Sequence, residues 1–313
     1  MISKTIRGLG NTEAIGTDGV PTSVYRKGVR LLWDPIKHLV NMSMAAGKVP
    51  VALKTGIIHP VYKGHGKNRA DPASYRPVSI LCALSKVLET VVKENVEAHL
   101  AAIDALPATQ HGFRRGRSCT TALAASHAEW VEAARHNIVG ILSFDLSAAF
   151  DTLDPAVLLP KLSALGILGR SNRWFASYLS GGLQVVDWNG TRSLPVAVKY
   201  GVRQGSILGP LLYLVHVADM PDTVSVAVED GNLNGTYADD SQVAAVGRTT
   251  ESVLGDLTKK AELFTKWAKG NGLAINGGKT QLLLSSGARY NADTAITVDD
   301  KTVKPRDELE LLG

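Results

Sequence analysis

A short apolar run from Ile138 to Phe144 ends directly in an acidic residue, Asp145. A nearly continuous apolar run of this length is typical of a strand that is buried on both faces of a sheet. The residue that follows such a strand lies at the edge of the sheet, where the core meets solvent. The run therefore predicts a central strand that presents a carboxylate at its C-terminal end.

A second segment places two adjacent acids in a turn. Asp239 and Asp240 lie between Leu233–Tyr237 and Gln242–Val246, which both have strand-like composition, so the segment predicts a tight hairpin with acids at its tip. Each motif alone has a simpler interpretation, because acids are common in solvated turns and at helix N-caps. Together with Asp145, they form a set of oxygen ligands suited to magnesium. Pairs of such ions, about 3.5–4 Å apart, serve in phosphoryl transfer.

The remaining patterns indicate both helices and strands. Apolar residues at three- and four-residue spacing predict helices, strand-like runs around Asn189-Gly190 predict a hairpin, and residues 1–30 are only weakly patterned. The predicted helices are Leu84–Leu100, Ser118–Arg135 with Ser118 as N-cap, a helix that starts at Asp154-Pro155, Pro210–Met220 and Thr250–Lys269; the predicted strands include Leu183–Asp187, Leu194–Tyr200, Leu273–Ile275 and Gln281–Leu284. This order predicts an α+β fold in which helices pack on a sheet.

Composition excludes several classes of protein. With 313 residues, of which 45% are hydrophobic, the chain can form a large core and is not disordered. Its apolar runs are shorter than the roughly 20 residues of a membrane-spanning helix and it carries no secretory pattern, so we expect an intracellular protein, nuclear or cytoplasmic, with no membrane contact. Cys82 and Cys119 do not have the number or spacing of a disulfide framework or zinc site, so we expect both to be reduced.

Positive charge is concentrated in the N-terminal third of the chain. The net charge of the whole chain is +5, yet Lys54–Arg76 contains five Lys or Arg residues against one acid, and His111–Thr120 contains three arginines and no acid. Nucleic-acid phosphates are suitable partners for such segments. A solvated basic surface that binds nothing explains the charge equally well.

Six short motifs occur in the order found in one family of polymerases. They are DPASYRPVSIL (71–81), QHGFRRGRSCTTAL (110–123), FDLSAAFDTLD (144–154), GVRQGSILGPLL (201–212), YADD (237–240) and NGGKT (276–280). In these motifs the chain resembles the reverse transcriptases of non-LTR (LINE-type) retrotransposons, over nearly its whole length. The resemblance implies a right-hand polymerase fold with fingers and an antiparallel palm sheet backed by helices. It also implies that the thumb is missing, because Leu309–Gly313 resembles only the start of the primer-grip block.

The resemblance implies an RNA-directed DNA polymerase that adds dNTPs to a primer 3′-hydroxyl with two Mg²⁺ ions, for which Mn²⁺ is a possible substitute. Asp145 and Asp239 match the principal metal ligands, and Asp240 matches the second acid of the hairpin. Lys279 matches a lysine thought to protonate the departing pyrophosphate, with an exposed turn lysine as the alternative. The implied partners are an RNA template, a DNA primer and dNTPs, and nothing indicates a protein partner.

Five further residues match the nucleotide pocket of the family. Phe150 matches the aromatic residue that excludes a ribose 2′-hydroxyl, although core packing is an alternative role for it. Gln204 and Gly205 match the lining of the pocket, where glycine permits close approach of the backbone. Arg76 matches the fingers arginine that holds the triphosphate, and Lys63 is a candidate second phosphate ligand.

For other polar residues we expect simpler roles. The arginines of the second motif, Arg114, Arg115 and Arg117, are expected to contact the template or primer backbone. Asp151 is expected to cap local main chain. His216 departs from the family pattern and is expected to be a core residue.

The motifs also suggest a division of the chain. Residues 1–50 would be an N-terminal extension and residues 51–313 the reverse transcriptase domain, with fingers at about 51–137, palm at about 138–313 and a fingers-like insertion at about 155–200. Two other functional readings stay open. One is a catalytically idle, truncated retroelement relic that at most binds nucleic acid, and the other is an unstable fragment without function.

Overall fold

The computed structural model describes residues 2–10, 15–64, 66–147, 149–225, 234–285, 287–309 and 311. The chain forms two compact units. The first unit contains residues 1–103 and 150–215, and the second contains residues 104–149 and 216–313. Each unit is therefore built from two segments that are separate in sequence. The boundaries of fingers and palm stay a prediction.

The first unit is rich in helices. They include α1 (Ile2–Gly8), α2 (Thr22–Lys27), α3 (Val29–Ala46), α4 (Ala83–Ala102), α6 (Pro155–Ala164) and α7 (Gly169–Leu179), with 3-10 turns at Val51–Leu53 and Pro72–Ser74. The predicted helix Leu84–Leu100 is confirmed as α4, and Asp154 caps α6 as predicted by accepting the Ala156 N–H at 2.8 Å. The weakly patterned N-terminal residues nevertheless form α1 and α2. Helices this short depend on packing, here against α3 and α4, rather than on their own sequence.

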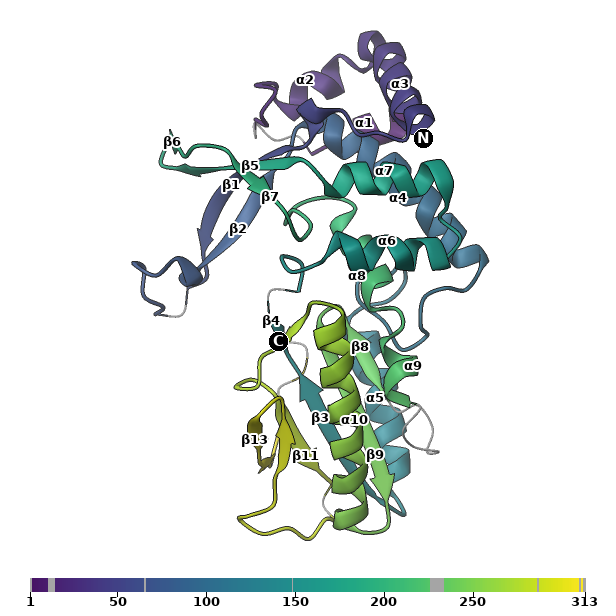
Figure 1. Cartoon of the computed structure of the whole chain (residues 1–313), viewed down its shortest axis with the longest axis vertical. Helices are drawn as coiled ribbons and strands as arrows, with labels where there is room; N and C mark the ends of the chain where they lie inside the picture. Colours follow the sequence, from purple (N-terminus) through teal and green to yellow (C-terminus); the bar gives the residue numbers. More distant parts are fainter. Residues whose placement is uncertain are drawn as a thin grey trace. The chain divides into compact units, whose positions relative to one another are not determined.

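A five-stranded sheet completes the first unit (Figure 1). Its strand β1 (Thr55–Tyr62) pairs antiparallel with β2 (Tyr75–Ile80) and parallel with β5 (Gly182–Trp188), which pairs antiparallel with β6 (Thr191–Arg192) and β7 (Val196–Val198). Strands β1 and β5 come from the two separate segments of the unit. Their pairing therefore joins these segments.

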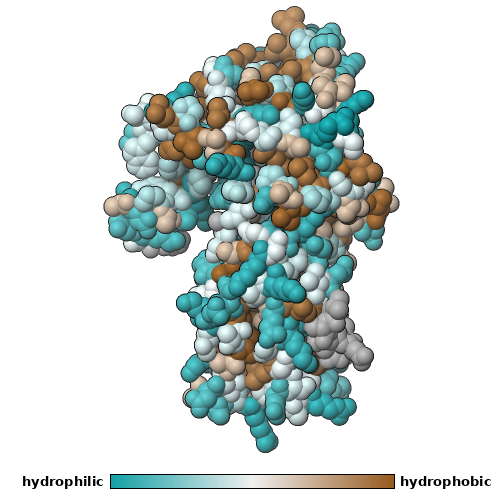
Figure 2. Space-filling view, viewed as in Figure 1, coloured by the Kyte–Doolittle hydropathy of each residue, from teal (hydrophilic) through white to brown (hydrophobic). Residues whose placement is uncertain are grey.

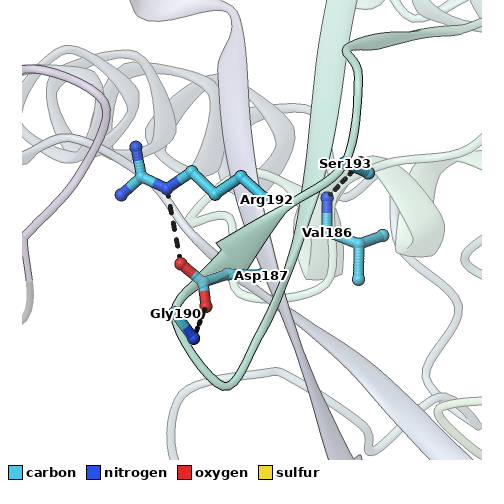
Figure 3. Close-up of polar contacts among 5 residues, drawn as sticks. All are labelled: Val186, Asp187, Gly190, Arg192 and Ser193. Atoms are coloured by element: carbon cyan, nitrogen blue, oxygen red, sulfur yellow. Dashed lines mark hydrogen bonds and ion pairs between the residues drawn. The ribbon is translucent and has the colours of Figure 1, made fainter.

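The β5–β6 hairpin forms at the Asn-Gly turn that the sequence predicts (Figure 3). Asn189 and Gly190 both have positive φ, 51° and 82°, as one class of tight two-residue hairpin turn requires. The Asp187 carboxylate accepts hydrogen bonds from the Gly190 N–H at 3.1 Å and from Arg192 Nε at 3.3 Å. Local polar contacts thus stabilise the turn.

A second five-stranded sheet forms the core of the second unit (Figure 1). In spatial order its strands are β14 (Pro305–Arg306), β11 (Gln281–Leu284), β3 (Ile138–Phe144), β9 (Asp240–Gly247) and β8 (Gly235–Tyr237). Neighbouring strands are antiparallel, as predicted, except that the edge strand β14 runs parallel to β11. Four residues of the predicted segments lie outside the described residues, namely Leu233, Glu310, Leu312 and Gly313, as does Ala148 of the third motif. The predicted central strand is confirmed as β3.

Two long helices and several short elements complete the second unit. They are α5 (Cys119–Ala134), α9 (Met220–Ser225), α10 (Thr250–Gly270), the paired strands β4 (Leu146–Ser147) and β10 (Ala274–Ile275), and the hairpin of β12 (Ile296–Val298) and β13 (Lys301–Val303). Ser118 caps α5 as predicted, because its Oγ accepts the Thr121 N–H at 3.2 Å.

Helices α5 and α10 pack on opposite faces of the second sheet. On one face Trp130 of α5 packs with Val139 and Ile141. On the other face the rings of Phe144 and Phe264 of α10 stack with their centroids 4.0 Å apart, and Figure 1 shows α10 running along β3 and β9. Odd- and even-numbered residues of β3 thus contact different helices, as the two-residue period of a strand requires.

The predicted helix Pro210–Met220 is instead two helices, α8 (Gly209–Val217) and α9. The break lies just before Pro221, which has no N–H group and is best accommodated in the first turn of a helix, its position in α9. His216 of α8 is fully buried, and its Nε2 lies 3.0 Å from Asn271 O. It is therefore a core residue, as expected.

The surface is mixed in polarity. Figure 2 shows hydrophobic residues interspersed with hydrophilic ones on the face in view. Among the helices of the described ranges, none is long and apolar enough to cross a membrane. Both cysteines are free thiols, Cys82 buried and Cys119 exposed, in agreement with the expectation from their number and spacing.

Candidate active site

Three acids lie at one end of the second-unit sheet. The last pair of β3 and β9 is Phe144 with Ser241, so the register places the next residues, Asp145 and Asp240, beside each other. Asp239 lies in the two-residue turn between β8 and β9. Strand pairing therefore brings together carboxylates from segments that are distant in sequence.

Burial and mutual repulsion shift the titration of these acids. The pKa of Asp239 is raised by burial and by the nearby Asp145 carboxylate. The pKa of Asp240 is raised to about 6, first by burial and then by the charges of Asp239 and Asp145. Lys279 opposes both shifts without cancelling them. Carboxylates that repel one another near neutral pH would be stabilised by a cation.

One ammonium group faces the acids. Lys279 Nζ lies 3.3 Å from Asp145 Oδ1, and the Lys279 side chain remains 66% exposed. The loop that carries it is fixed to the end of β3, because the Asn276 N–H donates to Asp145 O at 2.8 Å and the Lys279 N–H donates to Asn276 O at 3.0 Å. The NGGKT motif thus places its lysine at the acids while leaving it accessible.

The donor set has the chemistry of a magnesium site, since carboxylate oxygens are the ligands that this ion prefers. Within the described ranges, however, no three His, Cys, Asp or Glu side chains are close enough to form a complete metal-binding cluster. Magnesium commonly binds one or two carboxylates and keeps water or substrate phosphates as its other ligands, so a partial protein set is compatible with it. The metal role of the three acids stays a prediction.

Two residues expected at the nucleotide pocket lie together in the first unit. The Gln204 carbonyl accepts the Ser79 N–H at 2.7 Å, and Gln204 Nε2 donates to Asp151 Oδ2 at 2.9 Å. Asp151 therefore orients a distant side chain, instead of capping local main chain as expected. Gly205 has a φ of 106°, and a Cβ there would lie 2.6 Å from Ser79 O, so the position requires glycine. Ser79, Asp151 and Gln204 line a cavity of about 340 Å³.

Phe150 and Arg76 also lie in the first unit. The half-buried ring of Phe150 packs against Tyr213, with centroids 4.8 Å apart. Arg76 projects from β2 and is exposed. Phe150 has contacts suited to packing as well as to a steric role, and Arg76 is accessible to a phosphate.

The basic segment Lys54–Arg76 is only partly available to phosphates. Lys54 is 7% exposed and its Nζ donates to Ser177 Oγ at 3.2 Å and to Ser180 O at 3.1 Å; burial lowers its pKa. Lys54 is therefore a structural lysine, contrary to its place in the predicted basic surface. Lys63 is half-buried and its Nζ donates to a main-chain carbonyl at 2.8 Å. The exposed cations of the segment are Lys67, Arg69 and Arg76.

A family model described as "Reverse transcriptase (RNA-dependent DNA polymerase)" matches residues 63–313 of the chain. The chain belongs to the reverse transcriptase family. It is 30% identical over 278 residues to the "Probable RNA-directed DNA polymerase from transposon X-element" of Drosophila melanogaster. The matched region covers 86% of this chain and 30% of that protein. It is also 30% identical over 292 residues to the "RNA-directed DNA polymerase from mobile element jockey" of Drosophila funebris, covering 91% of this chain and 32% of that protein.

These comparisons confirm the resemblance to non-LTR retrotransposon reverse transcriptases. The chain spans less than a third of the length of the two relatives. Among solved structures, a telomerase from Candida tropicalis truncated from its C-terminal domain superimposes with a TM-score of 0.57 at 12% identity, over 85% of this chain and 57% of that one. The shared right-hand polymerase fold agrees with the predicted α+β class.

In this reverse transcriptase chain, two arginines of the second motif contact protein carbonyls. Arg114 Nη1 donates to Pro107 O at 2.5 Å and to Gln110 O at 3.3 Å, and Arg117 Nη1 donates to Gln110 O at 3.1 Å. Arg115 is exposed. Arg114 and Arg117 thus stabilise the loop that precedes them. Contact of the three arginines with template or primer stays a prediction.

Sequence analysis did not single out three residues that support the motifs of this reverse transcriptase. Gln110 and Gly112 contact the turn that carries Asp239. Glu89 of α4 is 1% exposed and accepts the Ile207 N–H at 2.7 Å, in the loop that follows Gln204. The position of an acid on the apolar face of a helix could have indicated Glu89. Nothing in the sequence around Gln110 indicates its contacts with the distant turn.

Proposed function

We propose that the chain is the polymerase part of a retrotransposon-derived protein, which synthesises DNA on an RNA template by adding dNTPs to a primer 3′-hydroxyl. The observation that carries this proposal is the placement of Asp145, Asp239 and Asp240 at one sheet edge, facing Lys279, in a chain of the reverse transcriptase family. The names of the relatives assign RNA-directed DNA polymerase activity to those longer proteins.

The three acids would bind the metal ions that the reaction needs. Asp145 and Asp239 would hold Mg²⁺ through carboxylate oxygens, with Asp240 adding negative charge beside them. When bound, two such ions activate the attacking hydroxyl and offset charge on the transferred phosphate. Lys279 offsets part of the charge of Asp145 in the unbound protein, and its exposed ammonium group is positioned to donate a proton to a departing pyrophosphate.

The residues that match the family's nucleotide pocket would select and hold the nucleotide. Gly205 lets the main chain approach closely, and Gln204 offers an amide whose orientation is set by Asp151. The exposed guanidinium of Arg76 suits bidentate binding of phosphate oxygens. Phe150 would exclude a 2′-hydroxyl by overlap. The proposed partners are therefore an RNA template, a DNA primer and dNTPs.

Primer extension by the purified chain on an RNA template, with Mg²⁺ and dNTPs, tests the proposal. Asp145→Asn and Asp239→Asn should each lower the extension rate at least about a hundredfold, because a metal ligand supplies several kcal/mol of charge stabilisation. Asp256→Asn, which alters an exposed ion pair with Lys259 on α10, should leave the rate unchanged. A wild-type chain that binds template–primer without extending it would instead indicate the idle relic.

A further inference from the structure

The turn that carries Asp239 has an unfavourable backbone conformation. Ala238, the first residue of this turn, has a φ of 55°. Alanine rarely adopts this left-handed conformation, because its Cβ approaches the carbonyl oxygen and it has no polar side chain to compensate. Ala238 is also only 8% exposed. Surrounding residues must therefore hold the turn in place.

A single side-chain amide contacts both main-chain polar groups of Ala238. Gln110 is 3% exposed, and its Oε1 accepts the Ala238 N–H at 3.0 Å. Its Nε2 donates to Ala238 O at 3.4 Å. The same Oε1 also accepts the Gly112 N–H at 2.7 Å, which fixes the amide relative to its own loop. The residue before Asp239 is thus bound on both its N–H and its carbonyl side.

Main-chain contacts bring the two segments still closer. A Cβ on Gly112 would lie 2.2 Å from Ala238 N, so no other residue fits without moving the turn. The Thr236 N–H donates to Thr109 O at 3.1 Å, and the His111 N–H donates to Thr236 O at 2.9 Å. The segment around Gln110 therefore extends the sheet beyond β8 and lies directly against the turn.

The two half-buried arginines of the motif complete this arrangement. Arg114 and Arg117 both donate to the carbonyl of Gln110. Two cations on one carbonyl fix the main chain from which the Gln110 amide projects. The QHGFRRGR segment is thus arranged around a turn from which it is separated by 128 positions in the sequence.

We propose that Gln110 and Gly112 are positioning residues for Asp239, which hold the Ala238-Asp239 turn in its left-handed conformation so that the carboxylate stays at the sheet edge. The effect on catalysis that this inference predicts rests on the proposed function. Catalytic groups need to be held to within about 0.5 Å of their productive position, so a turn that relaxes should lower the rate more than it lowers binding.

Two substitutions test the contact between Gln110, Gly112 and the turn, one by removing a polar group and the other by adding an overlapping atom. Gln110→Met keeps the length of the side chain but loses the amide, and Gly112→Ala introduces the overlapping Cβ. The matched controls are Asn172→Leu, which removes a side-chain amide of α7 that donates to Leu159 O at 3.0 Å in the first unit, and Gly255→Ala on α10, where an added Cβ meets no atom within 4 Å. Gln110→Met carries the test if Gly112→Ala does not fold.

Two measurements on the whole chain decide the outcome. Hydrogen–deuterium exchange should be faster in peptides that cover Thr236–Ser241 for Gln110→Met and Gly112→Ala, and unchanged for the controls. The kcat of primer extension should fall at least about tenfold, equivalent to about 1.4 kcal/mol, while the KM for dNTP and the Kd for template–primer change less than about threefold.

Unchanged exchange at the turn would overturn the proposal, as would a kcat no lower than that of the matched control after correction for the folded fraction. A wild-type chain without extension activity would contradict the proposed function. The exchange comparison would still decide whether Gln110 and Gly112 hold the turn.

Discussion

The ammonium nitrogen of Lys279 lies 3.3 Å from Oδ1 of Asp145, although the two residues are 134 positions apart in the sequence. This contact permits two roles for the lysine. It can offset the charge of the acids, or it can supply a proton to the leaving group. Arginine separates these roles, because a guanidinium keeps the positive charge but does not release a proton near neutral pH.

We expect Lys279→Arg to lower the single-turnover extension rate about 100-fold, within the range of general acid catalysis, while dNTP binding is retained. The control is Lys259→Arg, which changes another lysine paired with an aspartate, Asp256, at 3.2 Å. An arginine variant with the wild-type rate would reduce Lys279 to a charge-balancing residue.

Asp240→Asn should stabilise the protein at pH 7 in buffer without divalent cations. The pKa of Asp240 is about 6 in the folded chain against an ordinary 3.8, so folding stability is lost as the pH rises through this window. A full shift of this size is equivalent to about 3 kcal/mol. Because the side chain is only half-buried, we expect a gain of about 1–2 kcal/mol in the free energy of unfolding.

Urea unfolding at pH 4 and pH 7 measures this effect. The Asp240→Asn variant and the wild type should be nearly equal in stability at pH 4, where the carboxyl is mostly protonated in the folded chain, and should differ at pH 7. Asp256→Asn should behave like the wild type at both pH values. A stability difference that does not change with pH would contradict the raised pKa that burial and the neighbouring acids give Asp240.

Phe150→Val should raise incorporation of ribonucleotides relative to deoxyribonucleotides. If the ring occupies the volume of a 2′-hydroxyl, overlap costs about 1–3 kcal/mol, which is on the order of 10- to 100-fold in rate. The contact with Tyr213 makes some loss of stability unavoidable, so the ratio of the two rates is the informative quantity. Phe264→Val, which removes a stacked core ring, should lower stability and leave that ratio unchanged.

Template–primer binding should weaken steeply with salt, and individual cations should contribute unequally. Each phosphate contact adds roughly 0.7–0.9 to the slope of log K against log salt. Lys67→Gln, which removes an exposed cation of the same segment, should therefore reduce the slope by nearly one unit. Lys54→Gln should not, because that ammonium group is buried against Ser177 and Ser180. Equal slopes for the wild type and Lys67→Gln would remove Lys67 from the binding surface.

Glu89→Leu should destabilise the chain by about 2–4 kcal/mol, because the N–H groups of Ile207 and Leu208 would lose their acceptor, and that of Leu208 is buried. Glu89→Gln keeps an acceptor oxygen and should cost less than about 1 kcal/mol. Glu97→Leu, on the exposed side of the same helix, is the matched control. Thermal unfolding compares the three variants, and similar losses for Glu89→Leu and Glu97→Leu would show that the loop does not depend on Glu89.

Much of the local structure follows from short-range patterns. Ser118 bonds to Thr121, and Asp187 bonds to Gly190, so each of these contacts links residues three positions apart. A capping serine or an Asn-Gly turn acts through such neighbours, and its effect is therefore visible in a few adjacent letters. The apolar run of β3 is equally informative, because a strand buried on both faces needs apolar residues at nearly every position.

The sequence by itself thus determined the family, the α+β class and the identity of the acids, turns and caps, since these depend on residue type and local order. Only the tertiary structure decided that Lys54 is buried, that Asp151 orients Gln204, and that Gln110 forms hydrogen bonds with the main chain of the turn before Asp239. Each of these contacts joins residues from distant segments. Their geometry depends on strand register and helix packing, which create no periodicity around either partner, so no window of sequence contains the information.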